Sequence, residues 1–359
     1  MKKIILLFPL ILIFSACNVK KPAVGLEDQI FVVADSSEFE QMEATLSEVF
    51  GKIIYTPQPE HMFKLKRMSI NSLEKLKDKK NVIIAAPLNS GSYTAQYLTS
   101  ILDSNVTELV NNDSVHVINR YDLWAKNQLV MILTAKDMPT LLSEVKKDAN
   151  NLLHYFQKLS NKRLYQKLYN SVYENEKLEA QILKDYGFLI YCQIDFKLAM
   201  NKPEENFIWL RRAPGSDLER WIFVHWIDNA SPAMLNRDSV LALRDRLTQK
   251  FYRASDNVSY VTIADNYNKT TEINFKGRYA LFTQGLWRMS DRSMGGPFVN
   301  YTFLDEKSGR LYMLDGSIYA PKYEKKSLIQ QVDVILQSFM TKDELSNERI
   351  EDLMDELDD

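Results

Sequence analysis

The sequence predicts an α+β protein of two α+β lobes, mainly antiparallel sheet with flanking helices. Three observations lead to this prediction. Apolar runs of strand length alternate with segments of helical period in the first half of the chain, and aromatic, β-branched runs dominate the second half. Hydrophobic residues make up 45% of the 359 residues and aromatic residues 11%, which is enough for well-buried cores.

The first residues have the layout of a bacterial lipoprotein signal peptide. Two lysines precede an apolar run over residues 4–14, and Ser15-Ala16 stands directly before Cys17. The run is shorter than the ~20 residues of a membrane-spanning helix and is typical of a signal peptide. We therefore expect residues 1–16 to be removed and Cys17 to be acylated, palmitate included, which anchors the chain in the lipid bilayer. The alternative is a plain secretory signal with a chance cysteine.

Residues 17–28 predict a tether between the lipid anchor and the folded body, since they carry Pro and Gly and show no apolar period. The residue after the cysteine is Asn18. An Asp at that position would suggest retention in the inner membrane, so we expect a cell-envelope protein in the outer membrane that faces the periplasm.

The first lobe is expected over residues 29–160. Its strand and helix signals alternate, and two of the strand-length runs are apolar on both faces, which favours strands covered on both sides. A helix with an apolar stripe begins at Met138 and continues to Phe156. The expected strands are 29–34, 81–87, 114–120 and 128–134, the last two as an antiparallel pair, and the other helices are 39–50 and 92–102.

A helical connector is expected over residues 161–187, and the second lobe over 188–340. The second lobe is rich in strand formers, and Ser308-Gly309 predicts a hairpin turn. The expected strands are 188–196, 207–211, 221–228, 258–263, 279–287, 298–305 and 311–318, and the expected helices are 237–252 and 325–339.

The two lobes share a pattern that suggests an internal duplication. The run Ile30-Phe-Val-Val-Ala-Asp and the run Ile222-Phe-Val-His-Trp-Ile-Asp are each followed by an amphipathic helix. The competing explanation is chance, because two α+β layers built from the same strand–helix units look alike without common origin.

Charge is unevenly distributed along the chain. The net charge is −2, and residues 343–359 hold nine acidic and one basic side chain, which leaves residues 1–342 at +6. A body this weakly basic does not indicate nucleic-acid binding. The tail, residues 341–359, has an apolar stripe at Ile350, Leu353, Met354 and Leu357. It is either a helix that docks on the body or on a partner, or a solvated tail.

No sequence motif of a catalytic or cofactor site occurs: HExxH, GxSxG, Walker and Gly-rich dinucleotide patterns are missing. The four histidines show no pair at ligand spacing, so we expect no metal and no cofactor. His225 and His154 fall among apolar residues and are expected to be half-buried and hydrogen-bonded. Cys192 lies in an apolar run, which predicts a buried thiol, and acylation of Cys17 leaves it no disulfide partner.

Two loops carry side chains suited to binding. Residues 285–298 combine Gly-Gly-Pro with an aromatic stacking face and charges, which suits a sugar or an anionic group. A similar loop follows the strand that ends near residue 211. The candidate ligand-binding residues are Trp287, Arg288, Asp291, Arg292, Arg211 and Arg212. The competing interpretation is an ordinary pair of loops with exposed ion pairs.

At Arg278-Tyr-Ala, Gly285-Leu-Trp-Arg, Met294-Gly-Gly-Pro-Phe and Asp315-Gly-Ser-Ile-Tyr-Ala-Pro the chain resembles an uncharacterised family of bacterial lipoproteins classed as a domain of unknown function. The resemblance covers most of the mature chain and implies an exported lipoprotein of a Gram-negative envelope. It implies no catalytic residues.

Two functions remain open from the sequence. The first is a non-enzymatic envelope lipoprotein that binds a protein or glycan partner, and the absence of catalytic motifs favours it. The second is a hydrolase of envelope glycan or peptide, which needs two carboxylates in a cleft. Its candidates are Asp217, Asp228 and Asp291.

Overall fold

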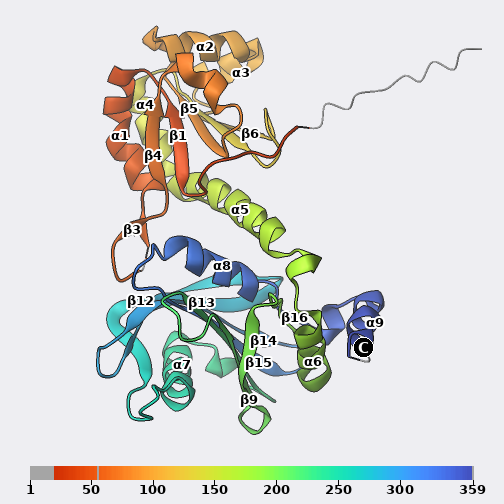
Figure 1. Cartoon of the computed structure of the whole chain (residues 1–359). Coiled ribbons are helices and arrows are strands. Elements are labelled where there is room, and N and C mark those ends of the chain that lie inside the picture. Colours follow the sequence, from red (N-terminus) through yellow and green to blue (C-terminus); the bar gives the residue numbers. More distant parts are fainter. Residues whose placement is uncertain (1–19, 55, 358–359) are drawn as a thin grey trace, which may run out of the picture. The chain divides into compact units, whose positions relative to one another are not determined.

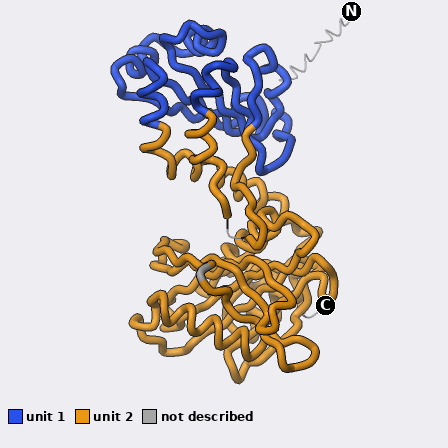
Figure 2. Tube along the Cα trace, turned by 90° about the vertical axis from the view of Figure 1, so that its left-hand side faces the viewer, with its two compact units in different colours: residues 1–42, 66–144 blue, residues 43–65, 145–359 orange. Residues whose placement is uncertain are grey.

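The computed structural model describes residues 20–54 and 56–357. The expected signal peptide and Cys17 therefore lie outside the described residues. The chain divides into two compact units, residues 1–42 with 66–144 and residues 43–65 with 145–359 (Figure 2). Both units combine helices with a sheet, which confirms the α+β class.

The first unit is built on a five-stranded sheet in the order β4-β1-β5-β7-β6. β1 (Gln29–Val33), β5 (Asn81–Ala85) and β7 (Leu129–Leu133) run parallel, and β6 (Val117–Tyr121) pairs antiparallel with β7, as predicted. β5 and β7 are buried over their whole length, as expected for strands that are apolar on both faces. The remaining elements are β4 (Lys64–Met68), η1 (Ile70–Leu76), η2 (Leu88–Ser90), α2 (Tyr93–Ile101) and α3 (Ser104–Asn111).

Two helices carry the chain between the units. α1 (Ser36–Phe50) begins in the first unit and ends in the second, and so does α4 (Met138–Lys147). One helix was expected from Met138 to Phe156, but the structure has two. α4 ends before Asp148, and α5 (Ala149–Leu168) begins directly after it. The Asp148 carboxylate accepts a hydrogen bond from the Asn151 amide at 2.6 Å, a local bond that competes with a continuous helix.

The second unit contains a seven-stranded antiparallel sheet in the order β12-β13-β14-β15-β11-β10-β9. Its strands are β9 (Phe196–Lys202), β10 (Phe207–Arg212), β11 (Glu219–Ile227), β12 (Val261–Phe275), β13 (Arg278–Met289), β14 (Gly295–Asp305) and β15 (Arg310–Tyr319). Shorter elements are β2 (Ile53–Ile54) with β3 (Glu60–His61), β8 (Phe188–Leu189) with β16 (Met340–Thr341), and η3 (Ser171–Tyr173), η4 (Pro203–Glu205), η5 (Pro232–Met234) and η6 (Lys342–Glu344).

A helix packs on each face of this sheet (Figure 1). α7 (Arg237–Phe251) packs its apolar stripe on the face that carries Phe223 and Trp287. α8 (Lys326–Leu336) packs on the opposite face, against Val224 and Leu314. The alternation of side chains along each strand thus gives the second unit two cores.

The C-terminal segment docks on the second unit. α6 (Glu176–Tyr186) and α9 (Asn347–Asp355) lie together, and Leu353 is fully buried against Ala180 and Leu183. The sequence left open whether the tail is a docked helix or a solvated segment. In the structure it is a helix that packs on the body.

The two sheets differ in strand order and in strand direction. The first has parallel strands at its centre and the second is antiparallel throughout. The fold therefore gives the suggested duplication no support.

Candidate functional site

A pocket lies in the second unit where α8 leaves one end of the sheet uncovered. α8 packs on β11, β14 and β15. Ile273 of β12 and Phe282 of β13 point to the same face and stay half-buried, and the Phe282 ring lies 4.8 Å from the ring of Tyr301 on β14. This end of the sheet forms an apolar, aromatic floor.

Two helices and one hairpin surround a space above this floor. The space has a volume of about 990 Å³. We call it the α5–α8 pocket. α5 and α8 form its helical walls, and the segment that includes β2 and β3 contributes Ile54, Met62 and Phe63. A concave, partly apolar space of this size is the usual form of a small-molecule site.

The contacts between α5 and α8 show that the two helices run in the same direction. Gln330 of α8 donates to the Asn161 side-chain oxygen at 2.7 Å and to Ser160 Oγ at 3.0 Å. Further along both helices, the Tyr169 hydroxyl donates to the Val334 carbonyl at 3.1 Å. The first turns of α8 and the first half of α5 therefore border the same end of the pocket.

That end is basic. His154, Lys158 and Lys162 follow one another at four-residue spacing on α5, and all three are exposed at the pocket. On α8, Lys326 Nζ lies 4.6 Å from the centre of the Phe63 ring. The expectation that His154 is half-buried is wrong, because the stripe that it occupies faces the pocket and not the core.

The α8 wall carries a partly buried acid. The Tyr301 hydroxyl donates to Asp333 Oδ1 at 2.5 Å, and Gln337 Nε2 donates to Asp333 Oδ2 at 3.0 Å and to the Tyr301 oxygen at 3.2 Å. Burial raises the pKa of the Asp333 carboxyl, although both hydrogen bonds act against the shift. Among the described residues that line the pocket, Asp333 is the one carboxylate, so the lining as a whole is positive.

A hairpin contact fixes the β2–β3 wall. The Glu60 carboxylate accepts hydrogen bonds from the backbone N–H groups of Lys325 and Lys326, each at 2.8 Å. These amides lie at the start of α8, where a negative charge is stabilised by the helix dipole. Residues 265 positions apart in the chain thus hold one wall of the pocket against another.

The segment 285–298, predicted as a loop, is the end of β13, a tight turn over residues 290–294 and the start of β14. Trp287 is only 1% exposed and its indole N–H donates to the Ile318 carbonyl at 3.2 Å, so its ring belongs to the core. Arg288 pairs with Asp265 at 3.0 Å. Asp291 accepts from the Ser293 hydroxyl at 2.7 Å, which is the main cause of its lowered pKa, and Arg292 is exposed.

The two arginines of the other predicted loop are bound to neighbouring acids. Arg211 pairs with Glu219 at 2.5 Å and Arg212 with Asp195 at 2.6 Å. None of the six predicted binding residues lines the α5–α8 pocket.

The three carboxylates considered for hydrolysis each have a different partner. Asp217 pairs with Lys322 at 2.5 Å, Asp228 with Arg310 at 2.7 Å, and Asp291 bonds to serine as described. No pair among them shares a partner in the described structure.

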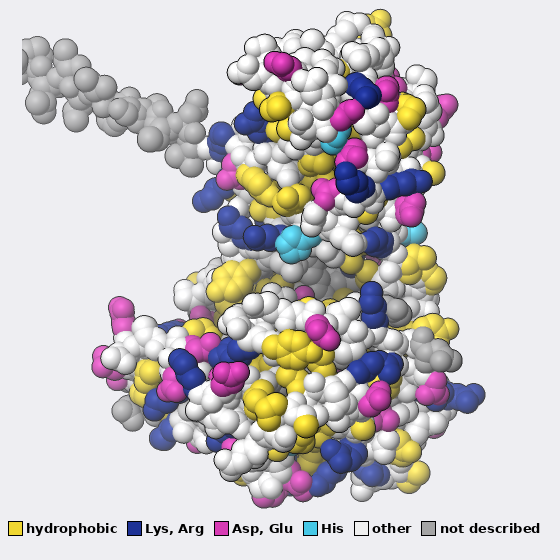
Figure 3. All heavy atoms as spheres, turned by 180° about the vertical axis from the view of Figure 1, so that it is seen from behind, with side chains coloured by type: hydrophobic (Ala, Val, Ile, Leu, Met, Phe, Trp, Pro, Cys, Tyr) yellow, Lys and Arg dark blue, Asp and Glu magenta, His cyan; other side chains and the backbone are white. Residues whose placement is uncertain are grey.

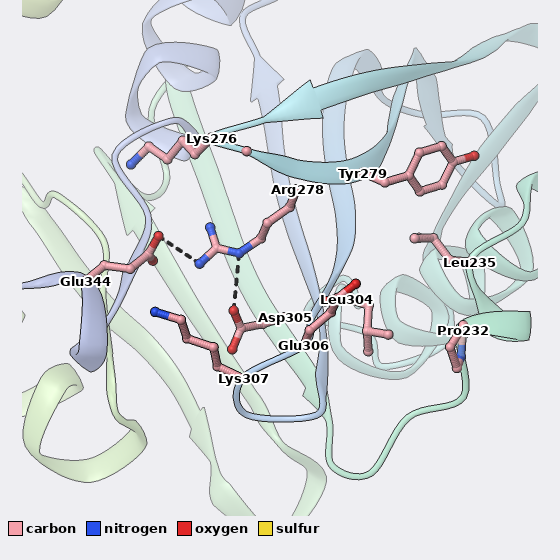
Figure 4. Close-up of a pocket in the computed structure, with 11 residues that line it drawn as sticks. Pro232, Leu235, Lys276, Arg278, Tyr279, Leu304, Asp305, Glu306, Lys307 and Glu344 are labelled. Carbon is pink, nitrogen blue, oxygen red and sulfur yellow. Dashed lines mark hydrogen bonds and ion pairs between the residues drawn. The ribbon is translucent and has the colours of Figure 1, made fainter.

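A second pocket, of about 580 Å³, lies at the end of the sheet where β12 turns into β13 (Figure 4). Arg278 points into its centre and bonds to Asp305 at 3.2 Å and to Glu344 at 2.8 Å. Lys276 Nζ donates to the Phe339 carbonyl at 2.8 Å. Since both cations hold the segment that leads to α9, we assign this pocket a structural role.

Sequence reasoning missed the residues of the α5–α8 pocket. α8 was predicted from its apolar stripe, and Asp333 lies inside that stripe between Val332 and Val334. An acid at a core position of an amphipathic helix was the available signal, since such a group needs a partner or a function.

Other features of the described residues bear on binding chemistry. Cys192 is buried, as predicted, and burial raises its pKa. Over residues 20–54 and 56–357, no cluster of His, Cys, Asp and Glu is arranged to hold a metal ion, and no helix is long and apolar enough to cross a membrane. On the face shown in Figure 3, basic and acidic side chains are interspersed with hydrophobic ones.

Comparison with solved structures finds distant likeness. Mog1p, a Ran-binding protein of Saccharomyces cerevisiae, is 10% identical with a TM-score of 0.29, and the match covers 44% of this chain and 90% of that one. A point mutant of Mog1 gives 11% identity, a TM-score of 0.29, and coverage of 43% and 90%. No curated protein matches the sequence.

Two family models match the chain, and together they span most of the described residues. Residues 23–169 match a family described as Domain of unknown function (DUF8532). Residues 175–338 match a family described as Domain of unknown function (DUF4837). The α5–α8 pocket draws residues from both matched ranges. The chain is thus similar to two families of domains of unknown function over separate ranges.

Proposed function

We propose that this chain is a lipid-anchored protein of the bacterial cell envelope that binds a small, largely apolar molecule without catalysing a reaction. The observation that carries the binding role is the α5–α8 pocket of about 990 Å³ with its aromatic floor. Polar groups such as the Asp333–Tyr301 pair and the lysines of α5 border this apolar surface, as in other small-molecule sites.

The anchor part of the proposal is supported by the sequence around Cys17. Cells given a clickable palmitate analogue should label the wild-type chain and leave Cys17→Ser unlabelled. Density-gradient separation of the membranes then tests the expected outer-membrane location. Equal labelling of both chains would contradict the anchor.

The binding part is tested with the full-length protein on zwitterionic phosphatidylcholine vesicles. A cetyl alcohol that carries a photoreactive diazirine is uncharged and serves as the probe. We expect it to crosslink to peptides of β12, β13 and α8 that line the pocket.

Ile329→Trp places a large ring into the pocket and should abolish this crosslink. Ile194→Trp makes the same change at a side chain that is 64% exposed and outside the pocket, and it should crosslink like the wild type. Crosslinking that Ile329→Trp leaves unchanged would refute a ligand site here.

A further inference from the structure

The α5–α8 pocket has charged groups on both helical walls. On the α5 wall, Lys158 and Lys162 lie one turn apart. On the α8 wall, the Asp333 carboxyl is bonded to Tyr301 and Gln337. The floor between them is hydrocarbon and aromatic ring, from Ile273, Phe282 and Val299.

The two lysines have no carboxylate of their own. Neither forms an ion pair or a side-chain hydrogen bond within residues 20–54 and 56–357, and α5 contributes no acid to the described lining of the pocket. The Glu60 carboxylate is bonded to the start of α8. An anionic group at the mouth therefore meets two uncompensated positive charges.

From this arrangement we infer that the ligand is a single-chain anionic amphiphile. Its head group lies at Lys158 and Lys162, and its hydrocarbon chain lies along the floor toward Tyr301. This inference rests on the proposed function of the same pocket and adds the ligand class. A free fatty acid and a lysophospholipid with an anionic head share this chemistry.

The same geometry disfavours a cationic ligand. A cation would need the carboxylate of Asp333, but that group is already bonded to two donors. Charge at the mouth is positive, which would repel a cationic head during entry.

The test compares two photoreactive probes on full-length protein in phosphatidylcholine vesicles. One probe is palmitate with a diazirine, and the other is the uncharged cetyl alcohol with the same group. Because wild-type and variant proteins share the same vesicles, partition of each probe into the bilayer cancels in the ratio of labelling.

Lys158→Gln with Lys162→Gln should lower palmitate labelling of the pocket about fivefold, since each exposed ion pair contributes little by itself. Labelling by the alcohol should not change. The matched control is Lys177→Gln with Lys184→Gln, which removes two exposed lysines from α6 and should leave both probes at wild-type levels. High salt should weaken only the palmitate signal.

The two probes separate failure of this inference from failure of the proposed function. If palmitate and the alcohol label the wild type equally and the lysine variant changes neither, the anionic head group is refuted while the apolar site stands. If neither probe reaches the pocket, the proposed function fails too. Competition by unlabelled palmitate and by lysophosphatidylglycerol supports the inference, and the compound that competes at lower concentration identifies the source.

Discussion

Arg244 of α7 and Asp315 of β15 form an ion pair at 2.6 Å in which the side chains are 1% and 0% exposed. Asp315 also accepts from Asn300 and Ser317, each at 3.1 Å. The Arg244 guanidinium lies over the Phe298 ring at 3.6 Å. The pair thus ties α7 to the middle of the sheet.

Asp315→Asn should destabilise the second unit by about 3–5 kcal/mol, because it leaves the Arg244 charge buried without compensation. Chemical denaturation followed by tryptophan fluorescence measures the change. Asp217→Asn, which breaks the exposed pair with Lys322, should cost about 1 kcal/mol or less. Equal losses of unfolding free energy for the two substitutions would contradict a dominant role of the buried Arg244–Asp315 pair.

Gly316→Ala should separate α8 from the sheet. A Cβ at this position would lie 2.0 Å from Val332 Cγ1, closer than any real contact. Overpacking of this kind costs about 1–3 kcal/mol. The double variant Gly316→Ala with Val332→Ala makes room for the added methyl group, so its loss in unfolding free energy should be smaller than the sum of the two single losses. Strict additivity would contradict the close approach.

The sequence predicted most elements of the second unit because each has a clear period. β10, β11, β13, β14 and β15 begin and end within a few residues of the expected positions. β12 was predicted only to Ile263, because the residues from Asp265 to Thr271 are mostly polar and are typical of a loop. It is an edge strand that pairs with β13 alone, and an edge strand tolerates polar residues.

The site could not be predicted because it depends on the order of strands and on contacts over long sequence separations. Trp287 and Arg288 are neighbours in the chain, but successive side chains of β13 point to opposite faces of the sheet. Trp287 therefore lies in the core beneath α7. The α5–α8 pocket joins residues near 60, 160, 280 and 330. Periodicity describes one element at a time and does not show which distant segments come into contact.

His225 makes the second unit sensitive to acid. Burial is the main cause that lowers its pKa from 6.5 to about 4, and its Nδ1 donates to the Asn206 carbonyl at 2.9 Å. In the unfolded chain the ring binds a proton at higher pH than in the folded chain. The contribution of neutral His225 is therefore fully present above pH 6.5 and is lost as the pH falls toward 4.

The loss should amount to about 3 kcal/mol of unfolding free energy. His225→Gln keeps a donor for the Asn206 carbonyl and has no titrating group, so its stability should fall less between these pH values. Denaturant titrations of both proteins at the two pH values measure the difference. Parallel pH profiles would exclude His225 as the cause.

Leu353 fixes the C-terminal helix on the body. Its side chain is fully buried among Ala180, Leu183 and Leu189. Leu353→Ala should cost about 3 kcal/mol, as for other buried leucines, and should detach α9 before the sheet unfolds. Hydrogen exchange then reports faster exchange in α6 and α9 and unchanged exchange in β13–β15. Glu351→Ala alters an exposed residue on the same helix and should exchange like the wild type. Uniformly faster exchange across the sheet would instead show that α9 and the sheet unfold as one.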